Sequence, residues 1–169
     1  MDAVLDLLKK YCKKEGLKVQ IILLGGLALH HYGMKDRATR DIDAEVRGNI
    51  DRLTAYLKAK GIPSDLGEDV SRWSVVSLPS GYRKRAKTIW RDKFLEVKVL
   101  HPADFIIAKL RRFTEQDIED ALFVAGKYGI KAGGLLKAMK DAVAHSPKDS
   151  SLASFQKSVR WFISKYLSG

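Results

Sequence analysis

The sequence predicts an α/β (α+β) fold, in which a mixed sheet with flanking helices is followed by a helical C-terminal half. Two observations predict it. Helix-like and strand-like segments alternate up to about residue 100, and the apolar stripes after His101-Pro102 all have helical spacing. We therefore expect an α/β core over residues 1–100 and a helical region over residues 101–169 that packs on it as a single compact unit.

The first segments read as helix, strand, helix and strand. An amphipathic helix over residues 2–14 ends at Gly16, and a β-branched run over 19–24 is typical of a buried strand. A short helix over residues 27–32 follows. Residues 41–46 alternate acidic with apolar side chains, as a strand with one wet face does.

The remaining segments complete the sheet and then become helical. A helix is expected over residues 50–60, and strands are expected over 72–78 and 94–100. Four helices with apolar stripes follow, separated by glycines and by Ser146-Pro147, over residues 103–113, 115–128, 134–144 and 151–167.

Composition excludes several classes of protein. The 169 residues are 46% hydrophobic and 30% charged, which argues against a disordered or fibrous chain. No run reaches the roughly 18 apolar residues of a membrane helix, and the N-terminus lacks a secretory signal, so we expect a cytoplasmic protein that does not enter a membrane. A single cysteine, Cys12, excludes an internal disulfide and a multi-cysteine zinc site.

The chain is strongly basic, with 31 Lys and Arg against 20 Asp and Glu and a net charge of +11. Such a charge attracts nucleic acid, a nucleotide or an acidic protein, although an ordinary solvated surface explains it equally well. Basic and aromatic residues mix over 82–91, as in single-strand nucleic-acid grooves, and a solvated basic loop is the alternative.

Two neighbouring motifs indicate chemistry. Gly25-Gly26 ends the first predicted strand, and Asp41 and Asp43 begin the next one on the same face. Paired carboxylates are ligands that Mg²⁺ prefers, and a glycine turn before a helix suits a phosphate. Together they suggest a metal-bound triphosphate site, with a salt-bridge cluster involving Arg37 and Arg40 as the alternative.

At these residues the sequence resembles the nucleotidyltransferase superfamily with the polymerase-β-type fold. Gly25-Gly26-Leu27-Ala28 and residues 37–43 look like the glycine turn and Asp-x-Asp of its small prokaryotic members, including abortive-infection and toxin–antitoxin nucleotidyltransferases. Residues 100–110 and the acidic stretch 117–120 are similar to a later segment of those branches. The resemblance covers about residues 18–125.

The resemblance implies roles for particular residues. Asp41 and Asp43 match the paired ligands of Mg²⁺ or Mn²⁺, and the family needs a third carboxylate on a neighbouring strand. We expect Glu96 in that role, with Glu45 in reserve. The expected nucleotide contacts are Gly25, Gly26, Thr39, Arg40 and Lys109. A merely solvated Lys109 is the alternative, and Asp117 and Asp120 are expected to hold it or a neighbouring arginine.

The implied activity is transfer of a nucleoside monophosphate from an NTP to an acceptor hydroxyl, on RNA, a protein or a small molecule. The alternative is a catalytically weak nucleotide- or RNA-binding module of the same fold, such as a toxin–antitoxin component, because Lys98 next to Glu96 can replace a cation with a fixed charge. A basic nucleic-acid-binding domain of another kind leaves the acidic alternation over residues 41–45 unexplained.

Overall fold

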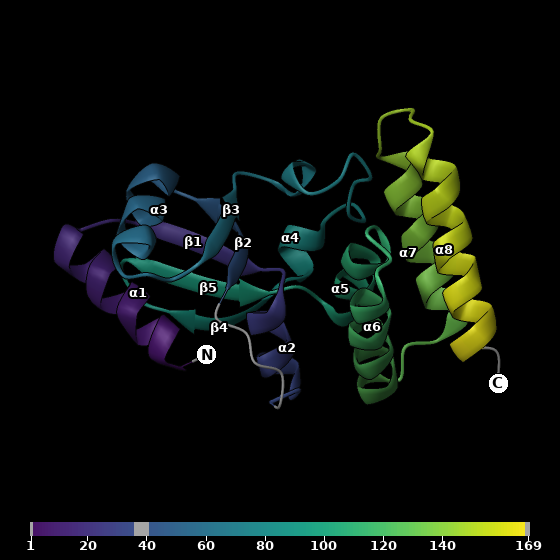
Figure 1. Ribbon diagram of the computed structural model, residues 1–169, viewed down its shortest axis with the longest axis horizontal. Helices are drawn as coiled ribbons and strands as arrows, with labels where there is room; N and C mark the ends of the chain where they lie inside the picture. The colour runs from purple at the N-terminus through teal and green to yellow at the C-terminus, as the bar shows by residue number, and fades with distance from the viewer. Residues whose placement is uncertain (1, 36–40, 168–169) are drawn as a thin grey trace. The chain divides into compact units, whose positions relative to one another are not determined.

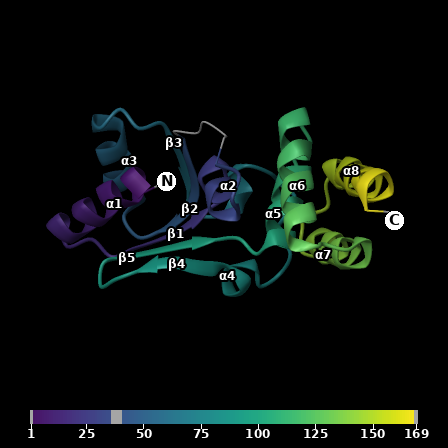
Figure 2. The same cartoon turned by 90° about the horizontal axis from the view of Figure 1, so that it is seen from below.

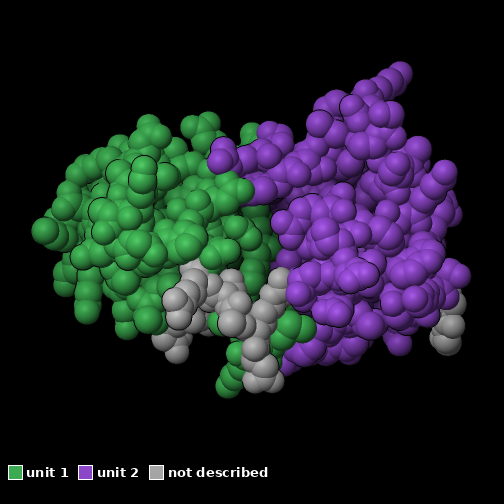
Figure 3. All heavy atoms as spheres, viewed as in Figure 1, with its two compact units in different colours: residues 1–69, 86–100 green, residues 70–85, 101–169 purple. Residues whose placement is uncertain are grey.

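The chain divides into two compact units in the computed structural model, which describes residues 2–35 and 41–167 (Figures 1 and 3). Unit 1 is Met1–Asp69 with Ala86–Leu100, and unit 2 is Val70–Arg85 with His101–Gly169. Residues 70–85 group with the helical unit rather than with the rest of residues 1–100. No helix in the described ranges is long and apolar enough to cross a membrane.

Unit 1 is built on a mixed sheet with the strand order β3-β2-β1-β5-β4 in the described part of the chain. Strand β1 pairs antiparallel with β2 and parallel with β5, so the predicted α+β class with a mixed sheet is confirmed. The elements of this unit are α1 (Asp2–Glu15), β1 (Val19–Leu23), α2 (Gly26–Tyr32), β2 (Ile42–Arg47), α3 (Ile50–Ala59), β3 (Ser64–Gly67), β4 (Lys87–Arg91) and β5 (Leu95–Val99).

The two faces of this sheet carry different side chains. One face is apolar and is covered by α1 and α3 (Figure 2). Its strands contribute Ile21, Ala44 and Val97, which are fully buried, and the helices contribute Cys12 and Leu57. Burial of this apolar area is the main favourable term in folding of the unit.

The opposite face, called the polar face below, carries the residues that alternate with this core. The three central strands β2, β1 and β5 place Asp43, Glu45, Arg47, Gln20, Glu96 and Lys98 there. The register aligns Arg47, Gln20 and Glu96 in one row across these strands. A sheet with one apolar and one polar face therefore results from the period-2 alternation of the sequence.

Both edges of the sheet are short strands. Strand β3 has four residues, and β4 has five residues with a register shift between Thr88 and Trp90. Strand β3 was not predicted from the sequence, because its segment is short, follows Pro63 directly and ends in Gly67. Strand β4 was not predicted either, because four of its five residues are exposed and it therefore lacks an apolar pattern.

Unit 2 is helical. Its elements are a 3₁₀ turn, η1 (Val70–Arg72), and the helices α4 (Tyr82–Arg85), α5 (Pro102–Leu110), α6 (Glu115–Tyr128), α7 (Ala132–Ala144) and α8 (Ser151–Tyr166). Helix α5 lies at the centre, in contact with α6, α7 and α8, and its Phe105, Ile106 and Ile107 have no exposed surface. The four long helices lie close to their predicted ranges.

The strand predicted over residues 72–78 is wrong. After η1 this segment is irregular and is held by side-chain bonds within unit 2. The Ser77 amide donates to Ser146 Oγ at 2.8 Å, and the Arg111 guanidinium donates to the Val76 carbonyl at 2.6 Å. Because side chains satisfy these backbone groups, no neighbouring strand is needed.

Unit 2 also buries a charged cluster. Lys109 on α5 lies with its Nζ 2.8 Å from Asp120 Oδ2 and 3.5 Å from Asp117 Oδ1, both on α6. All three side chains are at least 95% buried, and Arg112 adds a second ion pair to Asp117. Burial raises the pKa of Asp117, but the bonds from Arg112 and Thr114 outweigh it and the net shift is downward.

This cluster yields a first prediction. Lys109→Met should lower the free energy of unfolding by about 3–5 kcal/mol, because it leaves buried carboxylates without their central cation. Urea unfolding at neutral pH measures the loss. The matched control is Lys137→Met on α7, which removes an exposed lysine and should change stability by less than about 0.5 kcal/mol. Equal stability of the two variants would contradict a structural role for the cluster.

Candidate functional site

The two motifs singled out in the sequence meet in space. Gly25 lies between β1 and α2, Asp43 lies on the adjacent antiparallel strand β2, and the Leu24 amide donates to the Asp43 carbonyl at 2.9 Å. A Cβ built on Gly25 would lie 2.2 Å from Asp43 Oδ2. The Asp43 carboxylate therefore lies against the backbone of Gly25, in space that any other residue would fill.

A further carboxylate lies beside Asp43. Strand β3 pairs parallel with β2, and Asp65 is the register partner of Asp43. Residues at the same level of parallel strands point to the same face, so both carboxylates belong to the polar face. Asp65 is half-buried, like Asp43, whereas Asp41 directly precedes β2 and is exposed. The sequence analysis missed Asp65 because it missed β3.

Glu96 does not lie at this end of the sheet. It is the register partner of Gln20, four residues before Leu24, the residue that faces Asp43 across β1 and β2. Four residues of strand span about 13 Å, and β5 is two strands away from β2. The expectation that Glu96 joins Asp41 and Asp43 at one ion needs this correction, since metal ligands must lie within a few ångströms of one another.

Glu96 is instead held by donors from the two neighbouring strands, β4 and β1. Arg91 donates through Nε at 3.0 Å and through a second nitrogen, and Thr88 and Gln20 donate as well. Lys98 lies 3.9 Å away. The Arg91 guanidinium is the main reason that the pKa of Glu96 falls to about 2, and burial opposes the shift only in part.

The reserve candidate, Glu45, lies two residues after Asp43 on β2 and therefore on the same face of the sheet. Its side chain is 1% exposed, and its partner across β3 is Gly67. A buried glutamate beside a glycine is enclosed rather than open to a ligand. Glu45 is therefore less accessible to a ligand than Asp43 and Asp65, which are half-buried.

The expected nucleotide contacts are distributed unevenly. Gly25 and Gly26 are buried at the start of α2. Thr39 and Arg40, like Arg37, lie outside the described residues. Lys109 belongs to the buried cluster of unit 2, where two carboxylates pair with its ammonium.

The donor set around Asp43 fits a hard divalent cation. Asp41, Asp43 and Asp65 offer carboxylate oxygens, the ligand type that Mg²⁺ and Mn²⁺ take, and Mg²⁺ is usually held by one or two protein carboxylates with water and substrate oxygens in its other positions. Within residues 2–35 and 41–167, no group of three or more Asp, Glu, His or Cys side chains is arranged to hold a metal. The described geometry thus supplies two adjacent carboxylates rather than a closed cage.

Comparison with known families adds an independent observation. A family model described as "Nucleotidyltransferase of unknown function (DUF6036)" matches residues 2–166, which is nearly the whole chain. No curated protein matches the sequence.

The close approach at Gly25 yields a second prediction. Gly25→Ala should destabilise the protein by about 1–3 kcal/mol, because the new methyl group and the Asp43 carboxylate cannot share the same space. The control is Gly126→Ala within α6, where nothing lies within 4 Å of the added Cβ, and it should stabilise by about 0.5–1 kcal/mol. Urea unfolding measures both, and a Gly25→Ala variant as stable as the parent would contradict the contact.

The bonds of Glu96 yield a third prediction, on pH. Its pKa is lower in the folded state, so its stabilising effect is complete above the ordinary value of 4.5 and is lost as pH falls to about 2. Glu96→Gln should cost on the order of 1–3 kcal/mol at pH 7 and progressively less between pH 4.5 and 2. Urea unfolding across this range measures it, with the exposed Glu68→Gln as control. A cost that does not change with pH would argue against the ion pair.

Proposed function

Because the chain belongs to this nucleotidyltransferase family, we propose that it transfers a nucleoside monophosphate from a metal-bound NTP to an acceptor hydroxyl. In this reaction the acceptor oxygen forms a bond to the α-phosphorus, the bond from that phosphorus to the bridging oxygen breaks, and pyrophosphate leaves. Such a transfer asks the protein mainly for positioning and charge stabilisation.

One observation carries the proposal, namely that the Asp43 carboxylate lies on the backbone of Gly25 with Asp65 at the same level of the neighbouring strand. A glycine turn and an acidic strand motif are each common. The direct contact of these two motifs, beside a second carboxylate, supports the proposal that both belong to one site for a metal-bound NTP. A structural salt-bridge cluster does not require a glycine at the point where the carboxylate lies.

Asp43 and Asp65, with Asp41 at the start of β2, would hold Mg²⁺ or Mn²⁺. Such a cation, when bound, neutralises phosphate charge and polarises the phosphorus that is attacked. The protein keeps the two carboxylates at one level through the register of β2 and β3. A carboxylate of this cluster would also accept the hydroxyl proton of the acceptor.

The acceptor is RNA, a protein hydroxyl or a small alcohol, and the positive charge of the chain favours RNA. A second candidate function is a catalytically weak nucleotide- or RNA-binding module, such as a toxin–antitoxin component. The place of Glu96 favours it, since Arg91 holds this carboxylate far from Asp43. The two functions differ in whether label is transferred.

The experiment is incubation with each α-³²P-labelled NTP, Mg²⁺ or Mn²⁺, and either total RNA or a protein extract. Labelled RNA, labelled protein or a labelled small product identifies the acceptor. NTP that binds in a metal-dependent way but labels nothing would favour the binding module.

The fourth prediction concerns Asp43 itself. Asp43→Asn should weaken Mg²⁺-dependent NTP binding at least about tenfold, or about 1.4 kcal/mol, and remove transfer, because the amide keeps the shape of the side chain and loses its charge. Calorimetry and the labelling assay measure the two effects. Asp65→Asn should behave alike, whereas Asp51→Asn, at an exposed position on α3, should change neither. Parental NTP binding by both site variants would exclude a metal site at these residues.

A further inference from the structure

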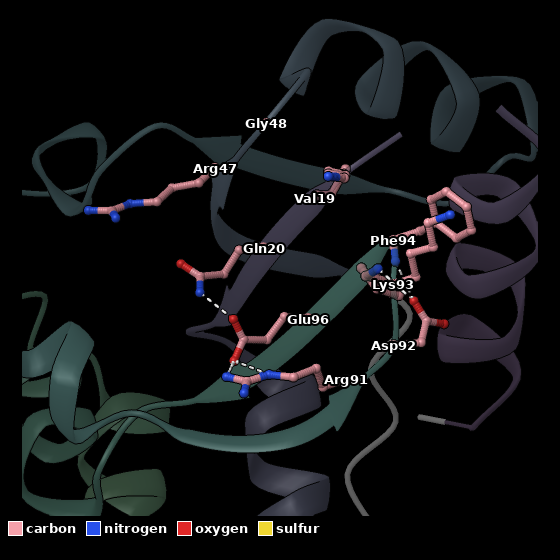
Figure 4. A pocket seen from close by; sticks show the side chains of 11 residues that line it. Val19, Gln20, Arg47, Gly48, Arg91, Asp92, Lys93, Phe94 and Glu96 are labelled. Atoms are coloured by element: carbon pink, nitrogen blue, oxygen red, sulfur yellow. Dashed lines mark hydrogen bonds and ion pairs between the residues drawn. The ribbon is translucent and has the colours of Figure 1, made fainter. Parts of the chain in front are cut away.

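A pocket of about 360 Å³ lies in unit 1 at the end of the sheet away from Asp43 (Figure 4). Its walls come from three places, which are the start of β1, the end of β2 and the hairpin that joins β4 to β5. Gln20 and Glu96 form part of its lining, between Arg47 and Arg91. Glu96 was predicted from the sequence as a metal ligand and Arg91 as part of a basic segment, but a pocket formed with Lys18, Arg47 and Lys93 was not predicted.

The pocket is positively charged. Four cationic side chains line it, namely Lys18, Arg47, Arg91 and Lys93, against the two carboxylates of Asp92 and Glu96. The net charge of the lining is therefore +2. A concentration of like charge in a concave surface raises the local concentration of anions.

The two carboxylates of the lining are already engaged. Asp92 accepts hydrogen bonds from the amides of Phe94 and Leu95, at 2.7 and 2.8 Å, and so closes the hairpin turn. Glu96 accepts from Arg91, Thr88 and Gln20. Both carboxylates are held by hydrogen bonds within the fold, and their charges are already counted in the net charge of +2.

Three cations remain unpaired by carboxylates. Among the described residues, no ion pair forms at Lys18, Arg47 or Lys93, and all three side chains are exposed. Lys93 only approaches the ring of Phe94, at 5.4 Å. Arg91 differs from these three residues because it pairs with a carboxylate, that of Glu96. The pairing fixes one side of its guanidinium and leaves the remaining N–H donors for a second anion.

The cations lie too far apart for one small anion. Arg47 is on β2 and Arg91 is on β4, with β1 and β5 between them, so three strand spacings, or about 14 Å, separate the two backbones. The guanidinium of Arg91 lies against Glu96, whereas the side chain of Arg47 points away from it (Figure 4), so a single phosphate would not contact both guanidinium groups in this arrangement. A chain of phosphates can contact both, and each phosphate it neutralises adds affinity through counterion release.

The pocket also lies on the polar face, where Asp43 lies. Arg47 and Asp43 are four residues apart on β2 and therefore point to the same side, with about 13 Å between their backbones. Glu45 and its partner Ile22, which lie between them on this face, are buried. The cations and the candidate metal site therefore lie on the same side of the sheet as two separate surfaces.

We propose that this pocket binds the phosphodiester backbone of a single-stranded RNA and positions it as the acceptor. The role of the RNA as acceptor rests on the proposed function. RNA binding itself rests on the pocket alone. Of the basic segment 82–91 singled out in the sequence, the proposal uses Arg91 but not Arg85 or Tyr82. Arg85 is bound to Asp104 and to the carbonyl oxygens of Pro79 and Ser80, and Tyr82 is buried.

The test measures binding of a 5′-fluorescein-labelled 12-nucleotide RNA by anisotropy between 50 and 200 mM KCl, without NTP. Lys18→Ala, Arg47→Ala and Lys93→Ala are combined, which leaves the Arg91–Glu96 pair in place. Affinity should fall at least tenfold at 100 mM KCl. The slope of log K against log salt should become shallower by about 2, since each lost phosphate contact contributes about 0.7.

The control combines Lys140→Ala, Lys148→Ala and Lys157→Ala, three exposed lysines of unit 2 with the same total charge. It should keep the parental affinity and slope. Equal losses in the two triple variants would overturn the proposal, because they would show an effect of net charge alone. Should the first triple variant not melt cooperatively, Arg47→Gln replaces it, with an expected slope change of about 0.7.

A competition experiment separates a strand from a small anion. Pyrophosphate at matched ionic strength should not displace the RNA, and displacement would assign the pocket to a small phosphate compound and overturn the strand assignment. The transfer assay separates the two proposals. If the parent protein transfers no label but binds RNA through the pocket, only the proposed function is refuted. If the parent protein transfers label and the first triple variant binds RNA as the parent does, only this inference is refuted.

Discussion

A carboxylate lies on the backbone of Gly25 because that residue has no side chain, and because β1 and β2 are held in the register that brings Asp43 there. The rest of unit 1 supports this contact. Helices α1 and α3 bury the apolar face and so fix the strands, while β3 adds Asp65 at the level of Asp43. The site therefore depends less on any one side chain than on the pairing of three strands.

Charges serve different purposes in the two units. In unit 2 they are buried and neutralised, as at Lys109 and Asp120, where the ion pair costs desolvation and leaves little capacity for a ligand. On the polar face of unit 1 the balance of charge differs between the two ends of the strands. Carboxylates gather around Asp43, whereas around Arg47 the cations outnumber the carboxylates of Asp92 and Glu96.

The sequence was sufficient where apolar periodicity is strong. Strands β1, β2 and β5 and the four long helices carry such a pattern, and the contact of Gly25 with Asp43 follows from their order. The edge strands have little apolar periodicity, so β3 and its residue Asp65 were not predicted. Glu96 was placed on the correct face, but its position along the strand depends on the register between β1 and β5, which a single strand does not encode.

Strand β4 is an edge, and an edge with unpaired backbone groups is a template for another chain. Its register shift after Thr88 bends the row of amides and carbonyls, and its exposed Lys87 and Arg91 bring like charge to any second copy that approaches. These exposed cations on β4 therefore oppose pairing of this edge with the same edge of a second copy. Arg91 thus has two effects, because it lines the basic pocket and also places positive charge on this edge of the sheet.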